Sequence, residues 1–374
     1  MEPKPKILMI LNDMAWFWSH RLPLAKGILK NGYKLTVAAE YAKDDSKMRD
    51  MGIDTRNLCG YDKGFNPLAE LLLLLSIHKA IKITKPDIIH AITLRHALYT
   101  GIAARLLRHP KSVFTIAGLG SLFAADSAKA KILRLIAMPV FKFAFGHKGA
   151  KLIFQNPDDY QIMIDRGVVN ASQCVIIKGS GVDLNQFPYT PPPHNDVPVM
   201  LFSSRLIAEK GLDDYVEASR LLKEKGIKAR FLVAGDTTHK NPKNMDPKQV
   251  QTWHDAELIE WLGNVDDMPK RLQSCDIFIL PSYYREGVPK VILEALATGR
   301  PIITTDKPGC KETVDEGING YKIPAKNGAA IAEKIETLLA DQNLMEKMSQ
   351  ASRQKAETEF SVDSVVERTL KIYE

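Results

Sequence analysis

Short apolar runs alternate with longer helical patterns along the first half of the chain. The runs typical of strands are KILMIL, KLTVAA, DIIHAI, SVFTIA and KLIF. Between them lie segments with helical spacing, such as WSHRLPLAKGILKNG and PLAELLLLLSIHKAIKI. Strands that are apolar on both faces and separated by helices indicate a parallel sheet covered on both sides. We therefore expect a doubly wound, Rossmann-like α/β domain over residues 1–185.

A proline-rich stretch, QFPYTPPPHNDVP, then interrupts the alternation and predicts a linker over residues 186–198. The pattern resumes with VMLFSS, ARFLVAG, DIFILPS and PIITTD, which predicts a second Rossmann-like domain over residues 199–358. The amphipathic segment 359–374 is expected to form a helix that crosses back over the domain junction. Open parallel sheets bind ligands at the carboxyl ends of their strands, so we expect the two domains to present these loops across a common cleft.

Positive charge is concentrated in the first half of a chain whose net charge is +7. Between Lys79 and Lys151 the acidic residues are only Asp87 and Asp126. Such a region attracts anions, and nucleic acid, an anionic membrane leaflet or a diphosphate would each fit. Because no nucleic-acid-binding module is recognisable, nucleic acid is not an expected partner.

The cysteines and the first apolar run indicate a cytoplasmic protein. The 4 cysteines show neither the CxxC spacing nor the Cys/His spacing of a metal site, and we expect reduced thiols rather than disulfides. The first apolar run is broken by Asn12 and Asp13. It is too short for a signal peptide or a membrane span.

Two cations follow the first strand of the second half. Arg205 lies at the strand end, and Lys210 with Gly211 lies where the next helix begins. A helix N-terminus presents backbone N–H groups and a favourable dipole to anions, and nearby cations strengthen such a site. Either side chain alone could be an ordinary surface cation, but together they predict a diphosphate site.

Two glutamates flank the start of a later helix in SYYREGVPKVILEALATGRPI. Pro289 suits the first helical position and Gly299 suits the C-terminal stop. Glu286 then lies at the mouth of the helix, and Glu294 lies about one and a half turns into it. Glu294 could accept hydrogen bonds from ribose hydroxyls, as acidic residues do in dinucleotide sites. Taken singly, either glutamate could also be a solvated helix carboxylate.

The combination of these motifs resembles the retaining GT-B glycosyltransferases of family 4. The resemblance rests on Arg205-x4-Lys210-Gly211, on Glu286-Gly287-Val288-Pro289 and on Glu294 in an E-x7-E spacing. It extends over nearly the whole chain, including IIKGSGVDLNQF and PGCKETVDEGINGYKIP, and is strongest to the branch that extends lipid-linked glycans, among them bacterial N-acetylgalactosaminyltransferases. It implies the GT-B fold, with two Rossmann-like domains facing across a cleft.

The resemblance also implies roles for individual residues. The candidate catalytic residues are Arg205 and Lys210, which would neutralise the leaving diphosphate, and Glu286, which would hold the sugar. The donor-binding candidates, for ribose, phosphate, sugar and base, are Glu294, Gly287, Val288, Asn264, Val265, Gly118 and Gly120. The donor would be a UDP-sugar, transferred with retention of configuration and without a protein nucleophile.

No metal or other cofactor is expected in this reading. Glycosyltransferases of the other common fold hold a divalent metal through Asp-x-Asp, and that tripeptide does not occur here, although Asp266 and Asp267 are adjacent. Cationic side chains would then take the place of the ion beside the diphosphate.

The first half supplies the glycine loop that, by the family resemblance, faces the donor, and it also supplies the candidates for acceptor binding. Gly118 and Gly120 follow a strand, but the third position of a dinucleotide fingerprint is Phe123, so that match is weak. The family's glycine loop often follows a histidine, whereas this chain has Ala117. We therefore assign no catalytic histidine there.

The acceptor candidates lie at two other strand ends. They are His20, and the H-x-x-T-x-(K/R) element formed by His90, Thr93 and Arg95. A lone histidine is often structural, so His20 and His90 stay candidates for acceptor contact or proton transfer.

A basic and apolar segment, residues 127–151, completes the prediction. A cationic amphipathic helix suits an anionic membrane surface, although a helix that packs on the sheet with a solvated basic face would show the same pattern. The family resemblance implies an undecaprenyl-diphosphate-linked glycan as acceptor. We expect a protein peripheral to the inner face of the cytoplasmic membrane.

Three alternatives remain open at this point. The first is a UDP-sugar epimerase on the same fold, which would turn over the UDP-sugar without an acceptor. The second is a glycosyltransferase with a soluble acceptor. The third is a non-catalytic nucleotide-binding module, which the presence of Arg205, Lys210, Glu286 and Glu294 argues against.

Overall fold

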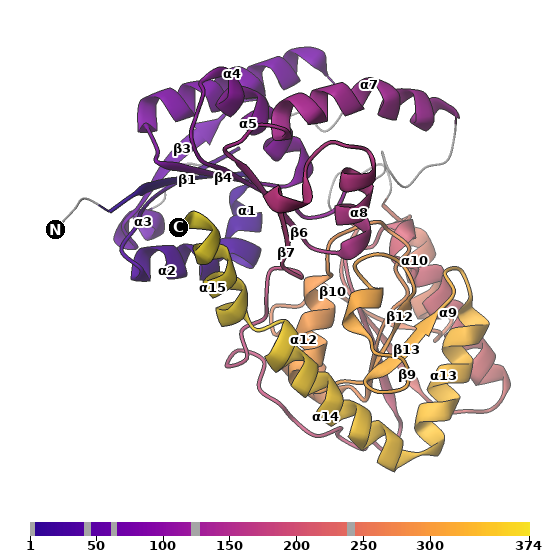
Figure 1. Ribbon diagram of the computed structural model, residues 1–374. Helices are drawn as coiled ribbons and strands as arrows, with labels where there is room; N and C mark the ends of the chain where they lie inside the picture. The colour runs from indigo at the N-terminus through magenta and orange to yellow at the C-terminus, as the bar shows by residue number, and fades with distance from the viewer. Residues whose placement is uncertain (1–3, 41–45, 61–65, 121–127, 238–243) are drawn as a thin grey trace. The chain divides into compact units, whose positions relative to one another are not determined.

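The computed structural model describes residues 4–40, 46–60, 66–120, 128–237 and 244–374. Contacts divide the chain into two units (Figure 1). The first unit comprises Met1–Ser180 together with Val362–Glu374, and the second comprises Gly181–Ser361. The C-terminal segment therefore returns to the first unit. Residues 186–197 contain no helix or strand.

The first unit is built on a parallel sheet with the strand order β3-β2-β1-β4-β5-β6-β7. Its strands are β1 (Lys6–Asp13), β2 (Lys34–Glu40), β3 (Ile53–Leu58), β4 (Ile88–Ile92), β5 (Ser112–Ile116), β6 (Ala150–Phe154) and β7 (Cys174–Ile176). Its helices are α1 (Met14–Trp16), a π-helical turn (Phe17–Arg21), α2 (Leu22–Lys30), α3 (Ser46–Asp50), α4 (Pro67–Thr84), α5 (Leu94–Leu106), α7 (Ala128–Phe145), α8 (Pro157–Asp165), a 3₁₀ turn (Ala171–Gln173) and α15 (Val362–Tyr373).

Helices cover both faces of this sheet, as the apolar strands require. One face packs against α4, α5 and α7, and the other packs against α2 and α15 (Figure 1). The helix starts follow local chemistry: the Asn66 side chain accepts hydrogen bonds from the first turn of α4, and Pro67 fills its first position. The predicted Rossmann-like domain is confirmed.

Helix α15 belongs to the first unit because it packs on α2. A Cβ atom added to Gly27 of α2 would lie 2.2 Å from Cγ1 of Val366, so only a glycine allows this approach. On the same face, the Tyr373 hydroxyl is hydrogen bonded to Nδ1 of His90 in β4 at 2.5 Å. The expected return of the C-terminal helix is therefore observed.

The second unit is also built on a parallel sheet, with the order β10-β9-β8-β11-β12-β13. Its strands are β8 (Val199–Ser203), β9 (Arg230–Ala234), β10 (Glu260–Gly263), β11 (Ile277–Leu280), β12 (Ile302–Thr305) and β13 (Gly320–Ile323). Its helices are α9 (Leu212–Glu224), α10 (Pro247–Asp255), α11 (Met268–Ser274), α12 (Lys290–Thr298), α13 (Gly328–Ala340) and α14 (Gln342–Glu359), with 3₁₀ turns at Ala208–Lys210 and Lys311–Thr313.

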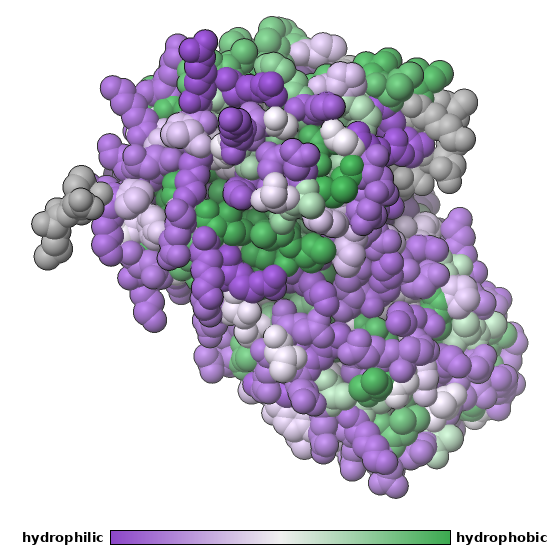
Figure 2. Space-filling model, in the orientation of Figure 1, coloured by the Kyte–Doolittle hydropathy of each residue, from purple (hydrophilic) through white to green (hydrophobic). Residues whose placement is uncertain are grey.

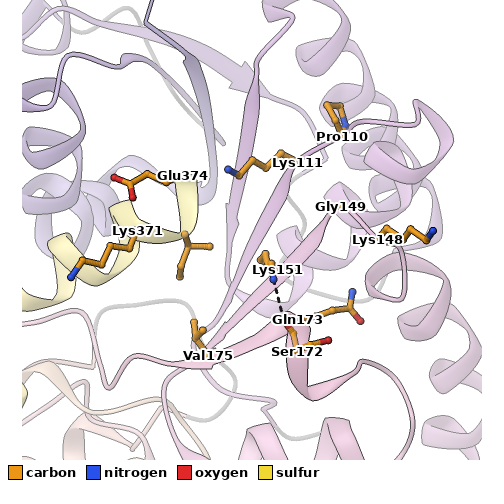
Figure 3. Close-up of a pocket in the computed structure, with 11 residues that line it drawn as sticks. Pro110, Lys111, Lys148, Gly149, Lys151, Ser172, Gln173, Val175, Lys371 and Glu374 are labelled. Atoms are coloured by element: carbon orange, nitrogen blue, oxygen red, sulfur yellow. Dashed lines mark hydrogen bonds between the residues drawn. The ribbon is translucent and has the colours of Figure 1, made fainter.

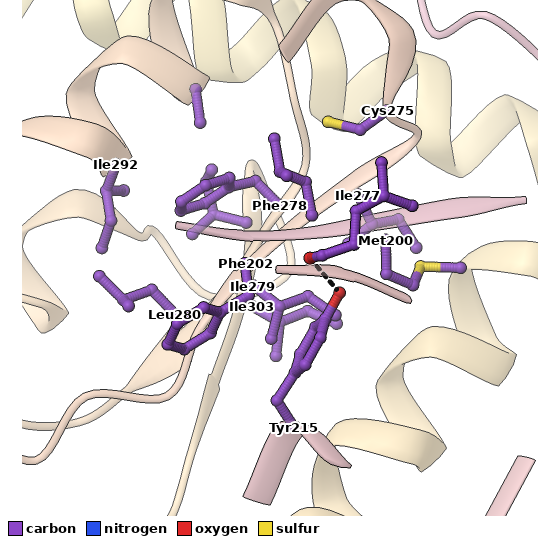
Figure 4. Close-up of a cluster of buried hydrophobic side chains, with 14 of the residues drawn as sticks. Met200, Phe202, Tyr215, Cys275, Ile277, Phe278, Ile279, Leu280, Ile292 and Ile303 are labelled. Carbon is purple, nitrogen blue, oxygen red and sulfur yellow. Dashed lines mark hydrogen bonds between the residues drawn. The ribbon is translucent and has the colours of Figure 1, made fainter. Parts of the chain in front are cut away.

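The core of the second unit lies between this sheet and its helices. Phe202 of β8 and Phe278 of β11 are fully buried there (Figure 4). Tyr215 of α9 is also buried, and its hydroxyl donates to the Leu232 carbonyl oxygen at 3.1 Å, so its polar atom is satisfied. This packing fixes the ends of β8 and β11 and the start of α12, and so positions the loops that follow the two strands.

Across the described residues, no helix is both long and apolar enough to cross a lipid bilayer.

Candidate active site

The carboxyl ends of β8 and β11 bring Lys210 and Glu286 together. Lys210 ends the 3₁₀ turn Ala208–Lys210, is 5% exposed and forms an ion pair with Oε1 of Glu286. The Ser282 hydroxyl donates to the same carboxylate oxygen at 3.2 Å. A buried ammonium is thus paired with a hydrogen-bonded carboxylate, which is the arrangement that a buried charge requires.

The loop that carries Glu286 is fastened to the turn that carries Lys210. The backbone N–H groups of Tyr283 and Tyr284 donate to the Glu209 carbonyl oxygen at 2.9 and 3.1 Å. The Lys210 ammonium lies 5.9 Å from the centre of the Tyr284 ring. The two loops therefore form one preorganised site that presents an ammonium and a carboxylate together.

Two glycines allow the loops to approach this closely. Gly211 has φ 79°, and a Cβ atom there would lie 2.3 Å from the Pro281 carbonyl oxygen. Gly309, after β12, has φ 92°, and a Cβ atom there would lie 2.2 Å from the Gly287 carbonyl oxygen. Both positions require glycine for conformation and for space.

Glu294 lies on α12, the helix that follows the loop of Glu286. The helix begins at Lys290, so Pro289 precedes the first helical residue instead of occupying it, while Gly299 ends the helix with φ 84° as expected. Burial raises the pKa of the Glu294 carboxyl, and the nearby Lys290 ammonium, 3.1 Å from Oε1, opposes that rise. Ionisation of this buried carboxyl is unfavourable unless the carboxylate gains a partner. A ligand hydroxyl that donates a hydrogen bond to it would be such a partner.

The remaining donor candidates lie around the same sheet edge. Arg205, two residues after the end of β8, is exposed, and Val288 is buried beside Gly287. Asn264, directly after β10, is exposed and donates through Nδ2 to the carboxylate of Asp236, which follows β9. Val265 packs at the edge of the core of the second unit.

Sequence reasoning missed three residues at this edge. Asp236 orients the Asn264 amide, Lys290 pairs with Glu294, and Gly309 supports Gly287. Lys290 could have been found, since it lies four residues before Glu294 and side chains at that spacing meet on a helix. Asp236 and Gly309 could not, because their partners are distant in sequence.

The candidates of the first unit occupy different environments. His90 is 0% exposed, and its ring nitrogens are hydrogen bonded to Tyr373 and to the Thr115 hydroxyl at 2.8 Å. Burial, and then the Arg21 guanidinium, lowers the pKa of His90 to about 3. This placement favours a neutral structural histidine over direct contact with an acceptor.

Thr93 and Arg95 begin α5 at the end of β4. Thr93 has φ 74°, a strained conformation for a β-branched residue and one that often marks functional sites. Arg95 forms ion pairs with Glu40 at 3.2 Å and Glu70 at 3.0 Å. Its guanidinium is thus engaged within the unit, and positioning of this edge is the role that its contacts support.

His20 lies in the π-helical turn that follows β1 and α1. Its ring stacks on Trp16, with centroids 4.9 Å apart, and its Nδ1 is hydrogen bonded to the Ser19 hydroxyl at 2.7 Å. Short π-helical segments are frequent at functional sites, so His20 keeps its place as an acceptor candidate.

The glycine loop after β5 is only partly described. Gly118 has φ 121° and Gly120 has φ 64°, so both adopt conformations that favour glycine. The intervening Leu119 N–H donates to the Asp159 carboxylate at 3.1 Å, which fixes the start of the loop. Phe123 and Ser127 lie outside the described residues.

A separate pocket of about 470 Å³ lies at the end of the first sheet that is opposite the carboxyl ends of its strands (Figure 3). It is formed at the amino ends of β5, β6 and β7, and Lys111, Lys148, Lys151 and Lys371 are among its lining residues. Because ligands of open parallel sheets bind at the carboxyl ends, this pocket is not part of the candidate active site.

Comparison with known proteins agrees with this geometry. Residues 6–156 match the family described as glycosyl transferase 4-like, and residues 190–355 match glycosyl transferases group 1. The chain is 26% identical over 374 residues to the N,N'-diacetylbacillosaminyl-diphospho-undecaprenol alpha-1,3-N-acetylgalactosaminyltransferase of Campylobacter jejuni, covering 96% of each chain.

Two further relatives extend the comparison. An Escherichia coli UDP-Gal:alpha-D-GlcNAc-diphosphoundecaprenol alpha-1,3-galactosyltransferase is 26% identical over 321 residues, which is 82% of this chain and 80% of that protein. The crystal structure of a glycosyltransferase from Rickettsia africae superposes with a TM-score of 0.77 at 21% identity, covering 99% of this chain and 98% of that one. These relatives are transferases, so the epimerase alternative is not supported. The chain belongs to the family 4 glycosyltransferases, with a glycosyl transferase 4-like first half, a group 1 second half and the GT-B fold.

Proposed function

We propose that this glycosyltransferase moves an N-acetylhexosamine from a UDP-sugar to an undecaprenyl-diphosphate-linked saccharide, with retention of configuration and without a metal ion. The observation that carries the proposal is the buried Lys210–Glu286 pair at the carboxyl ends of β8 and β11, followed along the chain by α12 with Glu294. The Campylobacter and Escherichia relatives, which are both named for a diphospho-undecaprenol-linked acceptor, support the lipid-linked acceptor, and the UDP-galactose donor of the Escherichia relative supports a UDP-sugar.

Lys210 and Arg205 would stabilise the departing diphosphate. In the transition state the bond to the sugar breaks and negative charge builds on the diphosphate oxygens. A desolvated ammonium that is already in place stabilises this charge more than a solvated one, since no reorganisation is needed. Arg205, at the same strand end, could add a second cationic contact from its exposed position.

Glu286 and Glu294 would hold the donor rather than transfer protons. Glu286 carries a negative charge beside the proposed diphosphate position, so sugar hydroxyls that donate to it would offset the repulsion. Glu294 would accept hydrogen bonds from the ribose. Those bonds stabilise the ionised carboxylate, whose pKa burial raises.

The protein would work from the inner face of the cytoplasmic membrane as a peripheral protein. A lipid-linked acceptor places the reacting sugar at the bilayer surface. The strongly basic sequence between Lys79 and Lys151 is suited to anionic headgroups there.

The test is incubation of the full chain with a panel of UDP- and GDP-sugars and a polyprenyl-diphosphate-linked glycan, with and without EDTA. We expect transfer from a UDP-N-acetylhexosamine, an α-linked product and no effect of EDTA. Nucleotide binding without transfer from any donor would overturn the proposed reaction. Loss of transfer in EDTA, restored by a divalent metal, would overturn the metal-free mechanism.

A further inference from the structure

The outward face of α4 is apolar. Leu68, Leu71, Leu72 and Leu75 are all exposed, Leu68 to 64%. Their spacing of i, i+3, i+4 and i+7 places them on one stripe of the helix, while Leu73 and other residues face the sheet. The sequence pattern predicts a helix that covers the sheet, and it does not reveal that a second face is also apolar.

Helix α7 exposes a similar stripe. Its exposed apolar residues are Ile132, Leu133, Leu135, Ile136, Val140 and Phe143, with Leu135 exposed to 75%. Arg134, in contrast, is buried. The described part of α7 therefore presents apolar side chains outward, contrary to a helix with only a solvated basic face.

The two stripes lie on helices that flank α5 in the same unit. Both α4 and α7 pack against α5. Arg105 of α5 donates to the Phe143 carbonyl oxygen at 2.7 Å and lies over the Phe143 ring. Figure 2 shows hydrophobic side chains along the edge of the molecule where α4 and α7 lie in Figure 1. Exposed apolar surfaces of this kind mark interaction sites.

The charged residues of α4, α5 and α7 indicate which partner this apolar surface binds. The sequences of α4, α5 and α7 contain one acidic residue, Glu70, which is paired with Arg95. Among the described side chains, α4 carries the exposed cations Lys79 and Lys82, α7 carries the exposed Lys142, and Arg105 of α5 is partly exposed. A second copy of the chain would bring like charges together on this surface. An anionic lipid bilayer provides both an apolar phase and opposite charge.

We propose that α4 and α7 together form a membrane-docking surface, in which the leucine stripe of α4 and the apolar stripe of α7 both enter an anionic leaflet. The inference rests on the proposed action at a membrane and deepens it by naming the surface. The proposed surface adds α4 to the membrane-binding segment predicted over residues 127–151, although the sequence of α4 shows no basic amphipathic pattern.

Vesicle binding of the full chain tests this surface. We expect flotation with vesicles of phosphatidylglycerol and phosphatidylcholine in equal parts, and much weaker flotation with phosphatidylcholine alone. The double variants Leu71→Glu/Leu75→Glu and Leu135→Glu/Ile136→Glu should each weaken binding by about tenfold or more, since charged groups replace apolar ones in the leaflet. A matched control is Val197→Glu/Ile318→Glu, exposed apolar residues of the second unit, which should bind like the wild type.

If the Leu71→Glu/Leu75→Glu variant binds anionic vesicles as well as the wild type does, α4 has no role in docking. Circular dichroism melting checks that each variant folds, and a variant that does not fold is replaced by Leu71→Ser/Leu75→Ser. Sedimentation of the chain without lipid tests the competing occupant. If these substitutions convert a dimer to a monomer and leave vesicle binding intact, the surface pairs two copies and the proposal is wrong.

Insertion is distinguished from surface attraction by a fluorescent reporter. Leu72→Trp should show added emission that is quenched by phospholipids brominated on their acyl chains, measured against the wild-type spectrum. Binding without such quenching would contradict insertion of α4.

Transfer assays separate this inference from the proposed reaction. The docking variants should transfer sugar normally to a short-chain, water-soluble acceptor and poorly to an acceptor embedded in vesicles. Failure of transfer to both acceptors by a vesicle-bound wild type would refute the reaction but not the surface. Normal vesicle binding by both docking variants would refute the surface but not the reaction.

Discussion

Lys210 is the side chain on which the proposed departure of the diphosphate depends most. Replacement by alanine removes a preorganised charge, a loss that typically costs about 3 to 4 kcal/mol of transition-state stabilisation. We expect Lys210→Ala to lower kcat by about two orders of magnitude or more in a donor-saturated transfer assay. Lys225→Ala, which breaks the exposed Lys225–Glu336 pair, is the matched control and should keep normal turnover. Near-normal turnover of Lys210→Ala would remove Lys210 from this role.

Glu294 should make donor binding sensitive to acid. Burial raises the pKa of its carboxyl, and Lys290 lowers it. Ribose binding needs the ionised form, so affinity is full above this pKa and falls as the pH drops through it. Lys290→Ala removes the lowering influence, and we expect the acidic fall in UDP affinity to move to higher pH. Calorimetric titration of UDP across the acidic range measures the shift.

Lys290→Arg is the control for this prediction, because it keeps a cation four residues from Glu294. Its binding profile should stay close to that of the wild type. Identical acidic profiles for Lys290→Ala and the wild type would show that Glu294 does not govern donor binding.

At the scale of elements, α15 is held to the first unit by the approach of Val366 to Gly27. A Cβ atom at Gly27 would meet Cγ1 of Val366 at 2.2 Å, too close for two carbon atoms. We expect Gly27→Ala to destabilise the protein by about 1 to 3 kcal/mol through this overpacking. Adding Val366→Ala removes the colliding methyl group and should restore part of that loss.

Thermal and denaturant unfolding of the two single variants and the double variant measure this coupling. The prediction is a favourable interaction energy between the two substitutions. If their effects simply add, the contact between α2 and α15 is looser than the structure indicates.

The elements also show what sequence patterns can and cannot reveal. The continuous apolar runs correctly predicted β1, β2, β4, β5 and β6 in the first sheet. The pattern did not reveal β3, β7 and β13, because their burial is interrupted or incomplete. Such strands can be identified from their pairing with neighbouring strands in the structure, but not from the pattern of their own residues.

The candidate site was predictable where chemistry is local. The two loops after β8 and β11 and the helix α12 were found from spacing and helix signals, and the structure places Lys210 against Glu286. The burial of His90 was not predictable, since its partners Tyr373 and Thr115 come from segments far apart in sequence. The outward stripe of α4 was missed for a related reason: a leucine-rich run does not show which leucines the sheet leaves uncovered.

At the scale of the whole molecule, the uneven charge predicts how salt acts on function. Docking to an anionic leaflet depends on exposed cations, whose attraction is screened over about 10 Å at 0.1 M salt and about 3 Å at 1 M. The Lys210–Glu286 pair is largely shielded from solvent, so the donor site is screened less. Raising the salt should therefore reduce transfer to a vesicle-embedded acceptor more than transfer to a short-chain soluble one. Equal inhibition of both reactions would place the salt-sensitive step at the donor site instead of the membrane surface.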